Sequence, residues 1–122
     1  MTEAVDTTQR EIVATALDYF EGWFDGDVAR MRRALHPELA KRSLIEDGGT
    51  LNETTTDWMV DATAKNLGKA QDVPDRLIEV EVVDVYRDIA SVVVRSAVYR
   101  EYVHLVRTRD GWKIVNALWA LS

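Results

Sequence analysis

The sequence predicts a single α+β domain with three helices near the N-terminus packed on one face of a curved, mostly antiparallel sheet. Apolar residues recur at helical spacing up to about residue 67, and they alternate with polar residues from residue 76 onward. Helices and strands that occupy separate parts of a chain are typical of α+β folds. The length of 122 residues fits one domain spanning 1–122.

The first two helices are predicted by their end signals. Thr8 followed by Glu11 forms a capping box that predicts the start of the first helix, and Gly26 predicts its end. Asp27 is suited to cap a short second helix, which Pro37 closes. The apolar face of the first helix comprises Ile12, Ala16, Leu17, Tyr19, Phe20, Trp23 and Phe24.

A short strand and a third helix are expected next. Residues 39–46 are predicted to form the strand, and Asp47, Gly48 and Gly49 a turn after it. The threonines at 54–56 offer N-caps for a helix that carries Trp58 on its apolar side and ends at Gly68.

The second half of the chain predicts an antiparallel meander. The double valine Val82–Val83 interrupts the alternation and predicts a bulge. Tight turns are expected at Arg87–Asp88, Arg100–Glu101 and Asp110–Gly111. The strands are expected at 76–86, 89–99, 102–109 and 112–121.

These turns predict which side chains share a face of the sheet. One face would collect Tyr99, Tyr102, His104, Ala117 and Trp119. An aromatic face with polar tips suits the lining of a small-molecule pocket. The opposite face would be aliphatic and form a homodimer surface. Its residues would be Val92, Val94, Val98, Val103, Leu105 and Leu118.

The composition excludes several kinds of function. The chain has no cysteine and two histidines, His36 and His104, so we expect no metal site. A net charge of −6 disfavours nucleic-acid binding. No apolar run reaches the roughly 20 residues of a membrane span, and the N-terminus lacks the pattern of a secretory signal. We therefore expect a cytoplasmic protein without metal or membrane partners.

Two segments carry a family resemblance: DYFEGWFDGDVARMRRALHPELAKRSL and YVHLVRTRDGWKIVNALW. They resemble the nuclear transport factor two-like (SnoaL-like) superfamily, and within it the "putative lumazine-binding" family of small bacterial proteins. The resemblance implies a cone-shaped, cystatin-like fold around a pocket. The superfamily contains isomerases, dehydratases, epoxide hydrolases and non-enzymatic partners, so the resemblance leaves the function open.

The resemblance also implies roles for individual residues. Tyr19, eight positions before Asp27, has the spacing of the tyrosine that donates to the oxyanion in ketosteroid isomerases. His104 aligns with a second, acidic donor, and Ser43 lies near the position of the general-base aspartate. Because a serine cannot remove a carbon-bound proton without a partner base, isomerase chemistry lacks its base here.

The leading interpretation is a homodimeric protein that binds a small, planar or apolar organic ligand without a cofactor. One alternative is an isomerase or dehydratase that uses Tyr19 and His104, the dehydratase set being completed by Asp57 or Asp84. Another is a non-catalytic protein-interaction or accessory subunit whose cavity is vestigial and filled by tryptophans, and whose sheet face binds protein. The predicted ligand-binding residues are Tyr19, Trp23, Ser43, Trp58, Tyr99, Tyr102, His104 and Trp119.

Overall fold

The computed structural model describes residues 2–44 and 49–122 of the chain. Within these residues four helices, α1 (Thr2–Asp25), α2 (Val28–Ala34), α3 (Thr56–Ala64) and α4 (Leu67–Ala70), accompany one six-stranded sheet. The strands are β1 (Leu35–Leu44), β2 (Leu51–Thr54), β3 (Glu79–Tyr86), β4 (Ile89–Arg95), β5 (Tyr99–Thr108) and β6 (Gly111–Leu121).

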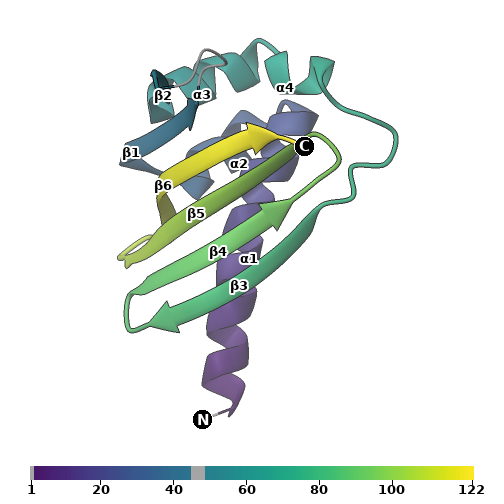
Figure 1. The fold of residues 1–122 in the computed structure, drawn as a ribbon. Coiled ribbons are helices and arrows are strands. Elements are labelled where there is room, and N and C mark those ends of the chain that lie inside the picture. Colours follow the sequence, from purple (N-terminus) through teal and green to yellow (C-terminus); the bar gives the residue numbers. More distant parts are fainter. Residues whose placement is uncertain (1, 45–48) are drawn as a thin grey trace.

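The sheet has the strand order β2-β1-β6-β5-β4-β3, in which β1 runs parallel to β6 and the other neighbours are antiparallel. Helix α1 crosses one face of this curved sheet, and α3 and α4 lie near the C-terminal end of α1 (Figure 1). The α+β class is therefore confirmed. No helix in the described part of the chain is long and apolar enough to cross a bilayer.

The core lies between α1 and the sheet. Ile12, Ala16, Phe20 and Phe24 from α1 are buried together with valines and other aliphatic residues of the strands. Burial of such side chains stabilises a fold by roughly 1.5–3 kcal/mol each. The strand residues in this core include Val92, Val94, Val103, Leu105 and Ile114.

Several predicted boundaries differ from the structure. Helix α1 begins at Thr2 rather than Thr8, because residues 2–7 contain neither glycine nor proline and continue the helix. Strand β1 begins at Leu35 and continues through Pro37. The predicted turn at Asp47 and Gly48, and the end of the predicted strand at 45–46, lie outside the described residues.

The predicted third helix is divided in two. Thr55 caps α3 as expected, since its side chain accepts a hydrogen bond from the Trp58 N–H. The left-handed backbone of Asn66, with φ of 62°, then breaks the helix before α4 begins. Gly68 therefore lies within α4 instead of ending the helix.

The predicted pairing of β4, β5 and β6 is wrong. The turn between β4 and β5 lies at residues 96–98, where the Ser96 hydroxyl accepts hydrogen bonds from the N–H groups of Val98 and Tyr99. The turn between β5 and β6 lies one residue earlier than predicted, because Thr108 pairs with Gly111. The bulge at Val82–Val83 is confirmed by the register shift there.

This register mixes the two predicted faces: Tyr99, Ala117 and Trp119 lie on the inner face as predicted, and Leu118 lies on the outer face as predicted. Tyr102 pairs with Val93 and Leu118, so it points to the outer, exposed face of the sheet, as does His104. The inner face of β5 carries Tyr99 and Glu101. Val92, Val94, Val103 and Leu105, predicted as an exposed dimer surface, are buried against α1.

Candidate functional site

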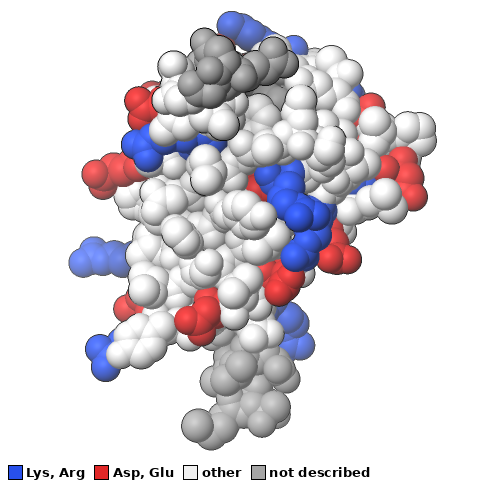
Figure 2. All heavy atoms as spheres, viewed as in Figure 1, with Lys and Arg blue, Asp and Glu red and all other residues white. Residues whose placement is uncertain are grey.

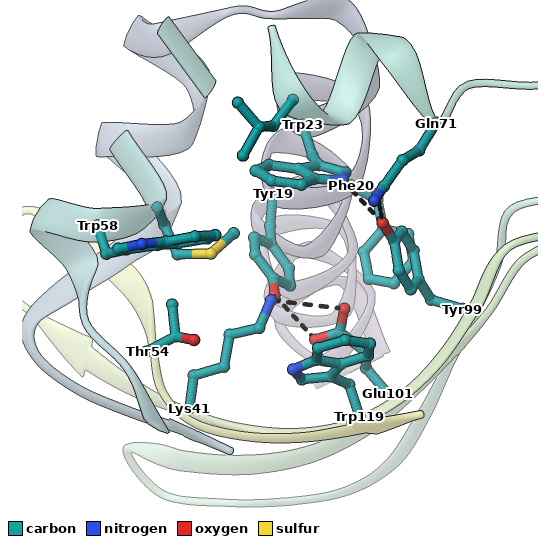
Figure 3. Close-up of a pocket in the computed structure, with 12 residues that line it drawn as sticks. Tyr19, Phe20, Trp23, Lys41, Thr54, Trp58, Gln71, Tyr99, Glu101 and Trp119 are labelled. Atoms are coloured by element: carbon teal, nitrogen blue, oxygen red, sulfur yellow. Dashed lines mark hydrogen bonds and ion pairs between the residues drawn. The ribbon is translucent and has the colours of Figure 1, made fainter. Parts of the chain in front are cut away.

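A pocket opens between α1, the α3–α4 region and the inner face of β1, β5 and β6 (Figure 3). The cavity has a volume of about 130 Å³, below the roughly 300–1,000 Å³ of typical small-molecule sites. A planar ligand would therefore lie partly in the open mouth of the pocket. The pocket is lined by Tyr19, Phe20, Trp23, Lys41, Thr54, Trp58, Met59, Leu67, Gln71, Tyr99, Glu101 and Trp119.

Aromatic rings that contact one another form the walls. Tyr99 meets Trp119 edge to face, with ring centroids 5.6 Å apart, and it contacts Phe20 in the same manner. Trp23 Nε1 donates to the Tyr99 hydroxyl at 3.2 Å, and that hydroxyl is also hydrogen-bonded to Gln71. These contacts fix the orientations of the aromatic rings around the cavity.

Trp58 is the wall residue with the most accessible ring. It lies in the first turn of α3 and remains 51% exposed although it lines the pocket. A large apolar side chain that stays half exposed beside a cavity is a ready contact for a ligand.

Three polar side chains, which we call the polar trio, meet inside the pocket. The Tyr19 hydroxyl donates to Glu101 Oε1 at 2.8 Å, and Lys41 Nζ donates to the Tyr19 hydroxyl (Figure 3). Lys41 Nζ also lies 3.9 Å from Glu101 Oε2. All three residues are buried: Tyr19 is 2% exposed, Lys41 7% and Glu101 3%.

Three different elements position the trio. Tyr19 belongs to the apolar face of α1, next to Phe20, whose ring it meets edge to face. Lys41 follows Leu39 by two residues along β1, so both side chains point to the inner face of the sheet. On β5, Glu101 lies between Tyr99 and Val103 on the inner face, because side chains two residues apart along a strand share a face.

Burial dominates the electrostatics of the trio. Desolvation raises the pKa of Glu101, and the attraction of Lys41 and the Tyr19 hydrogen bond oppose this rise only in part. Desolvation lowers the pKa of Lys41, against the opposing charge of Glu101. Both shifts are toward the uncharged form of the group, the amine for Lys41 and the carboxylic acid for Glu101.

Tyr19 connects these two groups. Burial, followed by the charge of Glu101, raises its pKa well above 10, so the hydroxyl keeps its proton. It accepts from Lys41 and donates to Glu101, and a proton can therefore move between them through Tyr19. Strongly perturbed groups that converge in a cavity are typical of functional sites.

The pocket brings together five of the predicted ligand-binding residues: Tyr19, Trp23, Trp58, Tyr99 and Trp119. Ser43 is buried on the same face of β1 as Lys41, opposite Trp119 in the register, but it does not line the pocket. Tyr102 and His104 lie on the outer face of the sheet.

The geometry does not support a catalytic pair of Tyr19 and His104. The sheet separates the two side chains, and His104 Nδ1 lies 3.4 Å from the side-chain nitrogen of Asn116 on the outer face. Asp57 and Asp84 are both exposed and do not line the pocket. His104 was expected in the pocket because a turn at Arg100–Glu101 would put it on the same face of the sheet as Tyr99.

Sequence reasoning missed Lys41 and Glu101. A signal for each was present, because Lys41 follows Leu39 by two residues and Glu101 stands between Tyr99 and Val103. Alternation through these apolar residues places both charges on the inner face. Glu101 was overlooked because it was assigned to a turn.

Comparison with known proteins agrees with this fold. A sequence model of the family described as "Putative lumazine-binding" matches residues 7–120. No match was found among curated proteins.

Solved structures resemble the chain at low identity. An NTF-2 like protein of unknown function from Silicibacter pomeroyi is 15% identical, with a TM-score of 0.71 over 100% of this chain and 99% of that one. An NTF2-like protein with a cystatin-like fold from Novosphingobium aromaticivorans is 17% identical, with a TM-score of 0.71 over 98% and 85%. A ketosteroid isomerase-like protein from Erwinia carotovora atroseptica is 18% identical, with a TM-score of 0.62 over 90% and 92%. These likenesses show the NTF2-like, cystatin-like fold.

Proposed function

The chain belongs to the family described as "Putative lumazine-binding", and on this premise we propose that it binds a small planar organic molecule in its pocket. The observation that carries the proposal is an open cavity with aromatic walls and a buried polar trio. Apolar pockets with a few directed polar groups are the usual form of small-molecule sites. An open cavity also favours ligand binding over an accessory subunit whose pocket is filled by tryptophans.

The arrangement suggests how such a ligand lies. Its flat face contacts Trp58 at the mouth and the rings of Trp23 and Trp119 on the walls. A carbonyl oxygen or similar acceptor points to the trio, where Lys41 Nζ is the donor, since the single hydroxyl proton of Tyr19 is donated to Glu101. A pteridine such as lumazine has both the flat rings and the carbonyl oxygens that this site would bind.

A second candidate function is isomerase-like proton transfer. The specific observation in its favour is the hydrogen bond between Tyr19 and Glu101, whose raised pKa favours the protonated acid. Protonated Glu101 can donate to an oxyanion, and Tyr19 joins it as a second donor when its hydroxyl turns from Glu101 to the ligand. Lys41, two residues before Ser43 on the same face of β1, supplies a basic amine. This version of the reaction does not use His104.

The test is calorimetric titration with lumazine and with 2-naphthylmethanol, a planar probe without a carbonyl group. Saturable binding of at least one probe is expected. Trp58→Ala should weaken it about five- to tenfold, because one aromatic contact contributes on the order of 1 kcal/mol. Tyr86→Ala, which removes an exposed aromatic ring far from the pocket lining, is the matched control. Absence of saturable binding for both probes, or equal weakening by the two variants, would contradict the proposal.

We also propose that a second copy of the chain covers the outer face of the sheet. On this outer face, cross-strand neighbours on β4, β5 and β6 carry uncharged side chains or histidine. We call these residues the outer-face patch. In the view of Figure 2, which has the sheet in front of α1, charged side chains lie mainly around the margin of this face. The patch comprises Ile89, Ser91, Val93, Tyr102, His104, Val106, Asn116 and Leu118.

The charges of the rim favour a second copy as the occupant. Arg95 of β4 pairs with Glu79 and Glu81 of β3. Arg42 of β1 pairs with Glu53 of β2. Two copies related by a two-fold axis through the patch bring no carboxylates together at its centre, although each chain carries a net charge of −6. An apolar centre with a polar rim is also the usual anatomy of an interface.

A further inference from the structure

The polar trio has the composition of a covalent site as well as a binding site. We propose that Lys41 forms a reversible imine with the carbonyl carbon of an aldehyde or ketone held in the pocket. This inference rests on the proposed binding function and adds the substrate class, a planar or apolar carbonyl compound.

The position of Lys41 distinguishes it from the other lysines. The sequence contains four, and of these Lys41 lines the pocket. Its Nζ lies 4.8 Å from the ring centroid of Tyr19 and 5.5 Å from that of Trp119. A carbonyl carbon between the aromatic walls therefore meets an amine that little water reaches. Lys65 and Lys69 are exposed, and Lys113 donates to the carbonyl of Arg33.

The surroundings of Lys41 favour the form of the amine that reacts. Only the neutral amine has the lone pair that attacks a carbonyl, and lysines become nucleophilic when a hydrophobic pocket desolvates them. Burial lowers the pKa of Lys41 in this way. Tyr19 also links the amine to Glu101, which accepts the proton that the ammonium group releases.

The reaction balances with the groups present. The Nζ lone pair forms a C–N bond while the carbonyl π electrons move to oxygen, which takes a proton from the carboxylic acid form of Glu101 through Tyr19. The nitrogen then gives one proton back to Glu101, and the carbinolamine results. Glu101 next protonates the hydroxyl, the C–O bond breaks, water leaves as the C=N bond forms, and the nitrogen returns its second proton to Glu101. The sum is one amine plus one carbonyl giving one imine plus one water, without oxidant or reductant.

A purely structural ion pair explains the geometry less well. Lys41 and Glu101 contact each other at 3.9 Å rather than at a close ion-pair distance, and Tyr19 is hydrogen-bonded to both. Both charged groups also border an open cavity instead of a closed core. Burying such a pair contributes little net stability, so its position beside a cavity points to chemistry.

The test traps the imine with 2-naphthaldehyde and sodium cyanoborohydride at pH 7, followed by intact mass and peptide mapping. We expect one adduct per chain on Lys41, formed at least tenfold faster than on Lys65, Lys69 or Lys113, because exposed lysines are protonated at this pH. Lys41→Arg should abolish this adduct, and Lys65→Arg, which alters an exposed lysine paired with Asp61, should leave it unchanged.

Binding of 2-naphthylmethanol separates the two possible failures. Labelling of the wild-type chain without preference for Lys41, together with saturable binding of 2-naphthylmethanol, would overturn the imine and leave the proposed binding function standing. Failure of both labelling and binding would overturn both. The wild-type peptide map decides the first question even if the Lys41 variant folds poorly.

Discussion

At the scale of single residues, Glu101 is a carboxyl group whose pKa is raised by its surroundings. It is buried on the inner face of β5, and its nearest polar partners are Tyr19 and Lys41. Because burial raises its pKa above the usual value of 4.5, the folded chain keeps a proton on Glu101 at a pH where the unfolded chain releases it. The stability of the protein is thereby linked to the chemistry of its pocket.

The pH dependence of stability should reveal this link. A raised folded pKa contributes stability that is fully present below 4.5 and is lost as the pH rises through the folded pKa. Glu101→Gln lacks this contribution. The free energy of unfolding of the wild type, minus that of the variant, should therefore fall as the pH rises from about 4.5 to 8, as measured by urea unfolding.

Lys41 affects the same measurement in the same direction. The lowered pKa of Lys41 contributes stability that is present above 10.5 and is lost as the pH falls through the folded pKa. In Glu101→Gln the carboxylate charge is absent, so the pKa of Lys41 is lowered further than in the wild type. Glu53→Gln, at a carboxylate 70% exposed, is the reference variant. A difference that stays constant or grows with pH for Glu101→Gln would contradict the assignment of a raised pKa.

At the scale of elements, the packing of α4 on α1 depends on Gly68. A Cβ atom built at this position would lie 2.2 Å from the backbone oxygen of Trp23 and 2.5 Å from its ring. Such distances require one of the helices to move. Since Leu67 and Gln71 of the α4 region line the pocket with Trp23, the absence of a side chain at Gly68 sets the position of that wall.

Gly68→Ala should therefore disturb both stability and binding. We expect a loss of about 1–3 kcal/mol in the free energy of unfolding, the range for overpacked sites, measured by urea denaturation. Binding of lumazine or 2-naphthylmethanol should weaken in the same variant. Lys69→Ala, at the neighbouring exposed position of α4, should change stability by no more than about 0.5 kcal/mol. Equal stabilities for the two variants would show that α4 moves at no cost.

At the scale of the whole molecule, we propose a different function for each side of the sheet. Its inner face carries the pocket with the polar trio, and its outer face carries the outer-face patch. The β5 strand contributes to both, since Glu101 points inward and Tyr102 outward. The two proposals can therefore be tested separately by substitutions one residue apart.

Leu118→Arg should produce a monomer. The leucine is exposed beside Tyr102 on the outer-face patch, and a two-fold axis through the patch would bring two arginines into the interface. We expect a dimeric mass for the wild type at micromolar concentration and a monomeric mass for the variant, by light scattering coupled to gel filtration. Leu77→Arg, at an exposed leucine outside the sheet, should remain dimeric. A monomeric wild type, or a dimeric Leu118→Arg, would contradict the proposed interface.

Much of the fold was predictable from local patterns in the sequence. The helical and alternating periods identified α1, α2, α3 and the four strands of the meander, and Asp27 and Thr55 cap their helices as expected. The division of the third helix was not predictable in this way, because Asn66 adopts its left-handed backbone within a continuous apolar pattern. Five of the six aromatic residues of the pocket were predicted because large apolar side chains on the helices and strands face inward.

The sequence by itself determined the α+β class, the order of the elements and the aromatic character of the pocket, since these follow from the spacing of neighbouring residues. Only the tertiary structure decided which polar side chains meet there. Tyr19 is 22 residues from Lys41 and 82 from Glu101, and the packing of α1 on the paired strands brings the three into contact. Because side chains alternate along a strand, moving one turn from 100–101 to 96–98 put Tyr102 and His104 outside and Glu101 inside.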